Sequence, residues 1–507
     1  MSLLWPGSKK SQHSIPHYDI QVDINARTMQ YSASAHVNIV PSNSTTAISL
    51  LLNQKCKVSA VNYLGLPLTY STRTKRQEDL QQITCHLPRR IRAGEKLILH
   101  MLYTGPLTNC TRQVVQLAPQ DFWYPFTPGQ SYTSSIKVTL PAAVKVVASG
   151  EMVEEKQANT RFQSTWEGRN PASGLHVLAG KFNRSQQDNL AVYYPKQLLN
   201  QARAVKKYGP VISQLLDNLL GPAAVSANYV VLTEENIASC TSSYITILSQ
   251  AEMADIERES ESPVQRNQAL FFTLAQKLAR QRLRCQLSTS VPAETWYLEA
   301  LAQYCSWLTL EDQYGEKEKI KVMLAARQLV IEDPPPPLNK MSGGIGCIFP
   351  ENAIAKATWI HHMVHNLLGD GFFPAVRQCL ESHIESAPST RDFFQEIGRA
   401  NQFDMAGFFR EWVEKSLPLK LVVEEPRTFL DDDGVWQLVF LLANKGKLRW
   451  PLPVDITLTL ENGSTEQHSR TVSAEPYLFS THSRVVRIEV DKKHRILNWA
   501  EQKTYEL

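Results

Sequence analysis

Strict alternation of apolar and polar residues marks two segments near the start of the chain, residues 17–24 and 33–39. A period of two is typical of a β-strand with one buried face. Alternation returns after about residue 421, where residues 455–460 lead into the hairpin signal Asn462 and Gly463. The region between them reads as mostly helices. The pattern therefore predicts strands, then helices, then strands again.

We expect three domains, because 507 residues are too many for one hydrophobic core. Their expected bounds are residues 1–188 for an N-terminal β domain, 189–420 for a mostly helical domain and 421–507 for a C-terminal β domain. Hydrophobic residues make up 43% of the chain and charged residues 20%, which is the composition of an ordinary soluble globular protein. The predicted fold class is multidomain α+β.

Charge and targeting signals narrow the function only slightly. The net charge of +4 is too small to argue for a nucleic-acid partner. No apolar stretch is long enough to predict a transmembrane segment, and the first residues lack the apolar core of a signal peptide. The cellular compartment of the protein is therefore not determined. The absence of a signal favours the cytoplasm, and an extracytoplasmic location follows if a natural anchor or signal was removed. The eight cysteines include no CxxC pair, so they indicate neither a structural zinc site nor a redox dithiol.

Residues 276–304 carry the most informative pattern. Glu299 follows Arg280 across residues 281–298, and its surroundings include further characteristic positions: Gln281, Trp296, Ala302 and Tyr304. The spacing and the neighbours resemble the gluzincin zinc aminopeptidases of the aminopeptidase N and leukotriene-A hydrolase type. In that family an HExxH helix supplies two His ligands and the general base, and a Glu at this spacing is the third zinc ligand.

The resemblance covers nearly the whole chain. Residues 354–364 resemble the family pattern YxKGAxxLxxL, with Lys356 at the Lys position. Residues 122–125 and residues 178–180 resemble landmarks of the family's N-terminal domain. The resemblance implies a saddle-shaped N-terminal β domain, a thermolysin-like middle domain and a C-terminal β-sandwich.

The residues that would perform zinc chemistry are replaced. The five HExxH positions hold Gln276, Lys277, Leu278, Ala279 and Arg280. A guanidinium has no lone pair to donate, an amide is a poor zinc ligand, and a lysine is a cation where the general base should stand. We therefore expect no cofactor, and zinc only if the interpretation as a pseudoenzyme is wrong.

Two further motifs of the family are also degenerate. Ile354 stands where the family has the Tyr that stabilises the tetrahedral intermediate, and isoleucine has no donor for an oxyanion. The GxMEN motif, which holds the free amino group of a peptide, is absent. Its best counterpart is residues 239–242, in which Thr241 replaces the Glu. The resemblance therefore implies a degenerate member that is not a zinc peptidase.

The altered site suggests an ion pair in place of the metal. We expect Arg280 to reach Glu299, so that replacing Arg280 by His alone destabilises the protein rather than restoring zinc. A functional alternative is that Lys277, Arg280 and Arg284, beside Glu299, turn the former active-site cleft into a cationic pocket. Such a pocket would suit a carboxylate ligand, for example a peptide C-terminus.

Three other patterns offer weaker alternatives. His361 and His365 have the spacing of a metal pair, but the family register puts them on the helix that follows the catalytic Tyr position, where they would line a helix face. Residues 343–346 resemble a phosphate loop only superficially, because the strand and the Lys of such a loop are missing. The prolines of residues 334–337 predict a stiff linker.

Three functions follow from this reading. The first is a catalytically inactive aminopeptidase-like protein, a pseudopeptidase, that binds an unidentified peptide or protein through the inherited cleft or the β surfaces. The second is a metallo-aminopeptidase-like hydrolase with residual or relocated metal chemistry. The third is a scaffold or sensor domain of a larger assembly.

Overall fold

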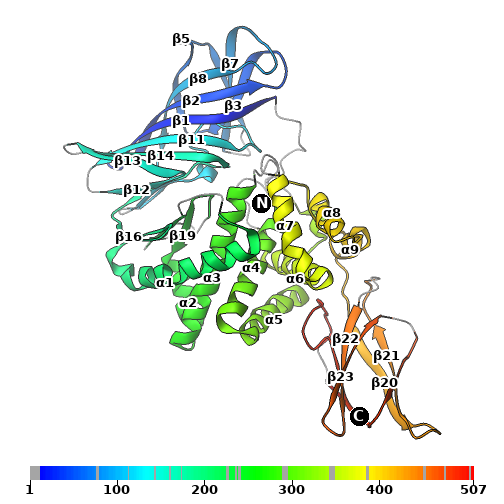
Figure 1. Cartoon of the computed structure of the whole chain (residues 1–507). Coiled ribbons are helices and arrows are strands. Elements are labelled where there is room, and N and C mark those ends of the chain that lie inside the picture. Colours follow the sequence, from blue (N-terminus) through cyan, green and yellow to red (C-terminus); the bar gives the residue numbers. More distant parts are fainter. Residues whose placement is uncertain are drawn as a thin grey trace.

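The computed structural model describes residues 12–507 except 76–78, 112–113, 142–143, 159–160, 173, 224–227, 234–236, 238–240, 288–294, 342–348, 384–386, 449–452, 473–474 and 502–503. Within this part, sheets form the beginning and the end of the chain and helices dominate the middle (Figure 1). The predicted order of strands, helices and strands is confirmed, and the fold is multidomain α+β.

The N-terminal region is built from strands in three sheets, at the top of Figure 1. In chain order the strands are β1 (His13–Asn25), β2 (Gln30–Pro41), β3 (Thr45–Asn53), β4 (Lys57–Tyr63), β5 (Leu66–Pro67), β6 (Tyr70–Lys75), β7 (Leu80–Ile91), β8 (Leu97–Pro106), β9 (Asn109–Cys110), β10 (Val114–Leu117), β11 (Tyr132–Pro141), β12 (Lys145–Ala148), β13 (Glu151–Ala158), β14 (Arg161–Ala172) and β15 (Val177–Gly180). The largest sheet has eight strands in the order β13-β14-β11-β1-β2-β8-β4-β5. The smaller sheets have the orders β3-β7-β6 and β12-β15-β10-β9.

Alternation along β1 buries one face of this strand. Tyr18, Ile20 and Val22 are almost fully buried, and the residues between them are more exposed. Fully burying an apolar side chain of this size contributes about 1.5–3 kcal/mol, so a slip of one residue would be costly. The strand pairs antiparallel with β2 and parallel with β11, which fixes it on both edges.

A fourth sheet joins the N-terminal strands to the helices. It contains β16 (Asn183–Gln187), β17 (Leu190–Tyr194), β18 (Asn228–Thr233) and β19 (Ile245–Ser249), in that order. Along β18, Tyr229 and Val231 belong to the core of the N-terminal region, whereas Val230 and Leu232 belong to the core of the helices. The sheet is therefore buried on both faces. Residue 188, the expected domain boundary, lies in the turn between β16 and β17.

The middle region is helical. Its helices are α1 (Leu199–Leu220), α2 (Gln250–Glu259), α3 (Pro263–Gln286), α4 (Trp296–Tyr314), α5 (Glu316–Glu332), α6 (Glu351–Leu368), α7 (Phe372–Ser382), α8 (Thr390–Ala400) and α9 (Ala406–Trp412). Short 3-10 turns occur at Pro119–Asp121, Lys196–Leu198, Leu338–Lys340 and Gly369–Gly371. The hydroxyl of Ser262 accepts a hydrogen bond from the backbone N–H of Gln265 (3.2 Å), and Pro263 occupies the first turn. This cap defines the start of α3.

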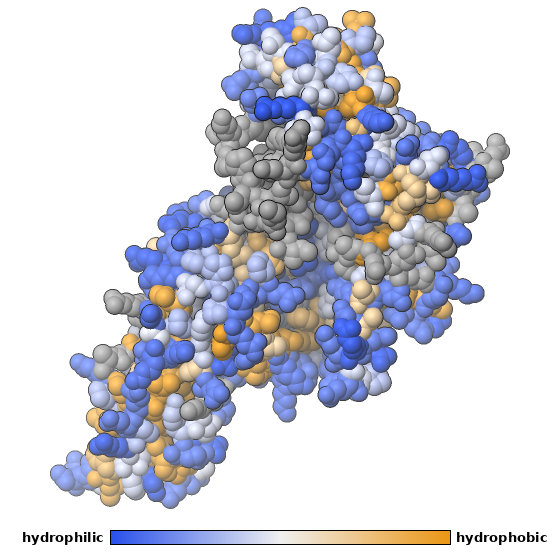
Figure 2. Space-filling view, turned by 180° about the vertical axis from the view of Figure 1, so that it is seen from behind, coloured by the Kyte–Doolittle hydropathy of each residue, from blue (hydrophilic) through white to orange (hydrophobic). Residues whose placement is uncertain are grey.

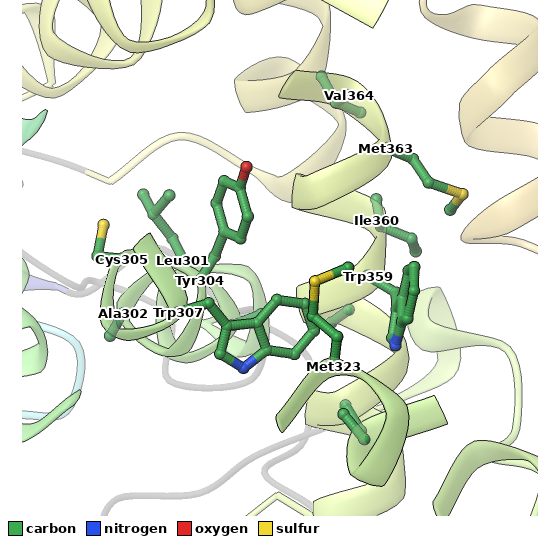
Figure 3. Packing of buried hydrophobic residues seen from close by; sticks show 14 of the residues in the cluster. Leu301, Ala302, Tyr304, Cys305, Trp307, Met323, Trp359, Ile360, Met363 and Val364 are labelled. Atoms are coloured by element: carbon green, nitrogen blue, oxygen red, sulfur yellow. The ribbon is translucent and has the colours of Figure 1, made fainter. Parts of the chain in front are cut away.

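Large aromatic side chains fill the space between α4, α5 and α6. Trp307 of α4 and Trp359 of α6 meet edge to face, with ring centroids 5.9 Å apart. Figure 3 shows both indoles near Met323 of α5, and Tyr304 on the same helix as Trp307. All four side chains are nearly fully buried. This packing holds α4, which carries Glu299, against α5 and α6.

The C-terminal region is again made of strands (orange and red in Figure 1). These are β20 (Leu421–Leu430), β21 (Trp436–Asn444), β22 (Pro453–Leu460), β23 (Thr465–Thr471), β24 (Tyr477–Thr481), β25 (Val485–Val490) and β26 (Thr504–Glu506). They form two sheets, β20-β21-β24 and β23-β22-β25-β26. The predicted hairpin is confirmed, because Gly463 turns the chain between β22 and β23 with φ of 83°. Arg327 of α5 donates to the carbonyl of Asn498 (2.5 Å), which ties this region to the helices.

The outer surface is mostly hydrophilic on the side shown in Figure 2, with apolar residues in separate patches. Some exposed apolar side chains lie on the C-terminal strands, among them Phe429, Leu430 and Leu478. Among the described residues, no helix is both long enough and apolar enough to cross a bilayer.

Candidate functional site

Helices α3 and α4 bring residues 276–280, which the sequence analysis aligned with HExxH, together with Glu299. The two helices pack along each other, and Glu299 lies in the first turn of α4. Leu278 and Ala279 are buried in the helical core, while Gln276 is half-buried. Arg280 and Arg284 are four residues apart, so one face of α3 presents both guanidiniums.

Glu299 pairs with both arginines. Its Oε2 forms an ion pair with Nε of Arg280, and its Oε1 accepts a hydrogen bond from Nη2 of Arg284 at 3.0 Å. The Arg280 contact meets the distance of an ion pair, but its N–H is not aligned for a hydrogen bond. The side chain of Glu299 is 14% exposed and that of Arg284 is 44% exposed. We call Arg280, Arg284 and Glu299 the guanidinium cluster.

Electrostatics keep the carboxyl of Glu299 ionised. Burial is the largest single influence and by itself raises the pKa of this group. The charges of Arg284 and Arg280, together with the hydrogen bond from Arg284, outweigh burial and hold the pKa of Glu299 below its ordinary value. The cluster therefore carries two positive charges and one negative charge at neutral pH.

Lys277 points to a different partner, which the sequence analysis did not identify. Its Nζ lies 3.0 Å from Oε1 of Glu252 on α2, and its side chain is only 7% exposed. The signal that could have revealed this partner is weak, because α2 and α3 are separate helices and no motif links the two positions. The lysine thus forms a buried ion pair beside the guanidinium cluster.

Thr241, which the sequence analysis aligned with the Glu of GxMEN, lies against the guanidinium cluster. The carbonyl of Thr241 accepts a hydrogen bond from Nη1 of Arg284 at 2.5 Å. The hydroxyl of Thr241 is buried and has no hydrogen-bond partner within the described part of the chain. Thr241 forms an isolated bridge with Thr246 ahead of β19, so it lies outside a regular strand. Ser239 and Cys240, the preceding residues of this candidate motif, lie outside the described residues.

Ile354 occupies the first turn of α6 and is 9% exposed, as part of the helical core. Lys356, two residues later, is also buried, and its Nζ donates to the carbonyl of Lys415 at 2.7 Å. Burial lowers the pKa of Lys356 to about 8. The lysine therefore holds the segment that follows α9, and the side chain of Ile354 has no hydrogen-bond donor.

His361 and His365 are engaged separately inside the protein. Nε2 of His361 lies 2.9 Å from the carbonyl of Tyr297, and Nδ1 of His365 lies 2.6 Å from the hydroxyl of Tyr304. Burial lowers the pKa of His361 to about 4, which keeps the ring neutral. Across the described residues, neither histidine belongs to a group of three or more side chains placed to hold one metal ion. The glycine-rich residues 343–346 lie outside the described part.

The residues that the sequence analysis aligned with the zinc ligands of the family do not fit zinc. A catalytic zinc site needs three protein donors. Here Glu299 is the one good donor, and two guanidiniums already bind it. Gln276 has only an amide oxygen, and Arg280 has no lone pair. No catalytic step through a metal can be derived for these residues.

Comparisons with known proteins support the fold. No family model and no curated protein sequence matches the chain. Among solved structures, it is similar to aminopeptidase A of Legionella pneumophila, solved in complex with aspartic acid, with a TM-score of 0.77 and 14% sequence identity. The match covers 98% of this chain and 60% of the Legionella chain. The chain thus spans about three fifths of that enzyme's length, and it has the fold of an aminopeptidase.

Proposed function

We propose that the chain is a catalytically inactive relative of the gluzincin aminopeptidases that binds the carboxylate of a peptide at the guanidinium cluster. The observation that carries this proposal is the pairing of one carboxylate with two guanidiniums where the family has its metal. The cluster keeps a surplus positive charge and lacks the donors that zinc requires.

Arg284 is the residue best placed to meet a ligand. A guanidinium has five N–H donors in a fixed plane, and that of Arg284 donates to the carbonyl of Thr241 and to the carboxylate of Glu299. Its side chain is 44% exposed, so part of the guanidinium faces solvent. A planar group with spare donors suits a carboxylate, which accepts two parallel hydrogen bonds. A ligand carboxylate would also neutralise the surplus charge of the cluster.

Two further observations agree with a carboxylate ligand. Thr241, whose carbonyl accepts from Arg284, has a buried hydroxyl without a partner among the described residues, and leaving such a group unpaired costs about 1–3 kcal/mol. The Legionella aminopeptidase was solved with aspartic acid, so a protein of this fold takes a small acidic ligand. We extend that chemistry to this chain on the strength of the arginines, with an unidentified peptide or protein as the partner.

The alternative of a hydrolase with relocated metal chemistry has less support. It would need His361 and His365 to turn away from Tyr297 and Tyr304, their present partners. A scaffold or sensor role within a larger assembly is compatible with carboxylate binding, since the fold does not require catalysis for either.

Peptide binding can be tested by fluorescence anisotropy with one labelled short-peptide pool in two forms, with a free C-terminal carboxylate and with a C-terminal amide. We expect the free acid to bind at least about tenfold more tightly, because a hydrogen bond to a charged group contributes about 1.5–3 kcal/mol. Arg284→Gln should abolish the preference. Equal affinity for the two forms would contradict the proposal.

Arg266→Gln is the matched control, because Arg266 is an exposed arginine on the same helix, near its start. This variant should keep the preference for the free acid. A loss in both variants would mean that overall charge, rather than the guanidinium cluster, attracts the peptide. An aminoacyl-anilide assay completes the test: turnover that a chelator abolishes would favour the hydrolase.

A further inference from the structure

A second group of chemically active side chains lies between α7 and α8, away from the residues discussed so far. Cys379 of α7, His383 at the end of α7 and Glu396 of α8 place their donor atoms within 4.8 Å of one another. Nε2 of His383 lies 2.9 Å from Oε1 of Glu396. In the described part of the chain, no other group of three or more such side chains is gathered this closely. We call these three residues the thiol cluster.

The local fold explains the arrangement. Cys379 and His383 are four residues apart, so they share one face at the end of α7. Ser389 caps α8 by accepting from the backbone N–H of Asp392 at 3.2 Å, which sets where that helix starts. Glu396 then faces the end of α7, against which α8 packs. Two donors from one helix and one from its neighbour are brought together without any local sequence motif.

The donor set matches zinc. Thiolate, imidazole and carboxylate are its three usual protein ligands, with bonds of about 2.0–2.3 Å. A tetrahedral ion with such bonds separates its ligands by about 3.3–3.6 Å, which is within the spread of the thiol cluster. A thiolate and a carboxylate would also balance the charge of a divalent cation. Because His383 and Glu396 are about one third exposed, the fourth position can face water.

A nucleophilic role for Cys379 fits the geometry poorly. The thiol is 3% exposed, and burial together with the neighbouring Glu396 raises its pKa. Reactive cysteines have the opposite properties, an accessible sulfur and a lowered pKa. A cation is the species that would stabilise a thiolate beside a carboxylate in this place.

We propose that Cys379, His383 and Glu396 form a zinc site that clamps α7 to α8. On binding, the thiol proton leaves to solvent, and the ion replaces the hydrogen bond between His383 and Glu396 with bonds to both. The site is independent of the guanidinium cluster, so either proposal can fail without the other.

Metal content tests the site directly. The full chain, dialysed with zinc and then against metal-free buffer, should retain about one zinc per chain, as expected for a three-ligand site. Cys379→Ser and Glu396→Gln, both close in size to the native residues, should lose it. With cobalt in place of zinc, the native chain should show a thiolate-to-metal charge-transfer band that Cys379→Ser lacks. Zinc should also raise the melting temperature of the native chain.

Two controls match these substitutions. Cys110→Ser changes a cysteine of the N-terminal region, and Glu381→Gln changes an exposed glutamate of α7. Both should retain zinc as the native chain does. A native chain that retains no zinc, or a Cys379→Ser variant that still holds one, would overturn the proposal. Should Cys379→Ser fail to fold, Glu396→Gln and the cobalt spectrum of the native chain still decide the matter.

Discussion

The guanidinium cluster and the thiol cluster follow the same plan. In each, two side chains four residues apart on one helix meet a glutamate from the next helix. They differ in the atoms that face the glutamate: two guanidiniums in the first cluster, a thiol and an imidazole in the second. Guanidiniums supply only N–H donors, whereas sulfur and imidazole nitrogen have lone pairs for a metal. Helix spacing therefore sets where a site can form, and donor chemistry decides what it holds.

The strongest way to break this comparison is to give the first cluster the donors it lacks. The variant combines Gln276→His, Lys277→Glu and Arg280→His in a Cys379→Ser background. We expect it to bind about one zinc ion per chain. Glu299 would complete the set of three protein ligands. Metal content after dialysis checks this outcome. A folded variant that binds no zinc would show that residues 276–280 do not correspond to the HExxH positions of the family.

Arg280→His alone is the control for that variant. It should hold no added zinc, because Gln276 remains a poor ligand. It should also lose about 2 kcal/mol of unfolding free energy, since Glu299 keeps only Arg284 as a partner. Urea unfolding measures the loss, and an unchanged midpoint would show that the ion pair with Arg280 does not contribute.

Removing the shared carboxylate should be the largest purely structural loss. Glu299→Gln leaves Arg280 and Arg284 without their counter-ion, and we expect about 3 kcal/mol of destabilisation in urea unfolding at neutral pH. This loss is at the lower end of the range for breaking a buried ion pair, because Arg284 is partly exposed. Glu381→Gln, on the exposed surface of α7, should stay within about 0.5 kcal/mol of the native chain. Equal effects of the two substitutions would refute the role of Glu299.

Acid should remove the advantage of the native chain over Glu299→Gln. The folded-state pKa of Glu299 lies below its unfolded value of 4.5, so its contribution is complete above pH 4.5. It is lost as pH falls through the folded-state pKa. Unfolding midpoints of the two proteins, measured from neutral pH downward, should therefore converge only below pH 4.5. Convergence already near neutrality would contradict the lowered pKa.

Of the single substitutions in the guanidinium cluster, Arg284→Gln should have the smallest effect on stability, below about 1 kcal/mol, because the side chain is 44% exposed. Added salt should shrink the difference further. The same variant should nevertheless abolish the preference for a peptide carboxylate. A loss of stability much larger than that of Arg280→His would show that Arg284, rather than the less exposed Arg280, is the main partner of Glu299.

The sequence predicts the regular parts of the molecule and one of the two clusters. Alternation identifies β1 and β2, and the turn at Gly463 follows from its dipeptide signal. Glu299 and Arg280 can be paired because a family spacing links them. The partner of Lys277 could not be predicted, since Glu252 lies on a separate helix and no periodicity relates the two.

The thiol cluster shows a different limit. The absence of a CxxC pair argues only against zinc sites whose cysteines are neighbours in sequence. Cys379 and His383 do have the spacing of helical ligands, but Glu396 comes from α8, beyond a connection whose path the sequence does not specify. Helix packing, rather than a motif, determines this contact.

The position of β1 in the large sheet constrains the order of events during synthesis. His17 and Thr133, which share a hydrogen bond of 2.7 Å, are 116 residues apart in the chain. During synthesis β1 therefore waits, with one edge unpaired, until β11 has emerged. During that interval its alternating apolar face and free edge are open to chaperones and to other nascent chains.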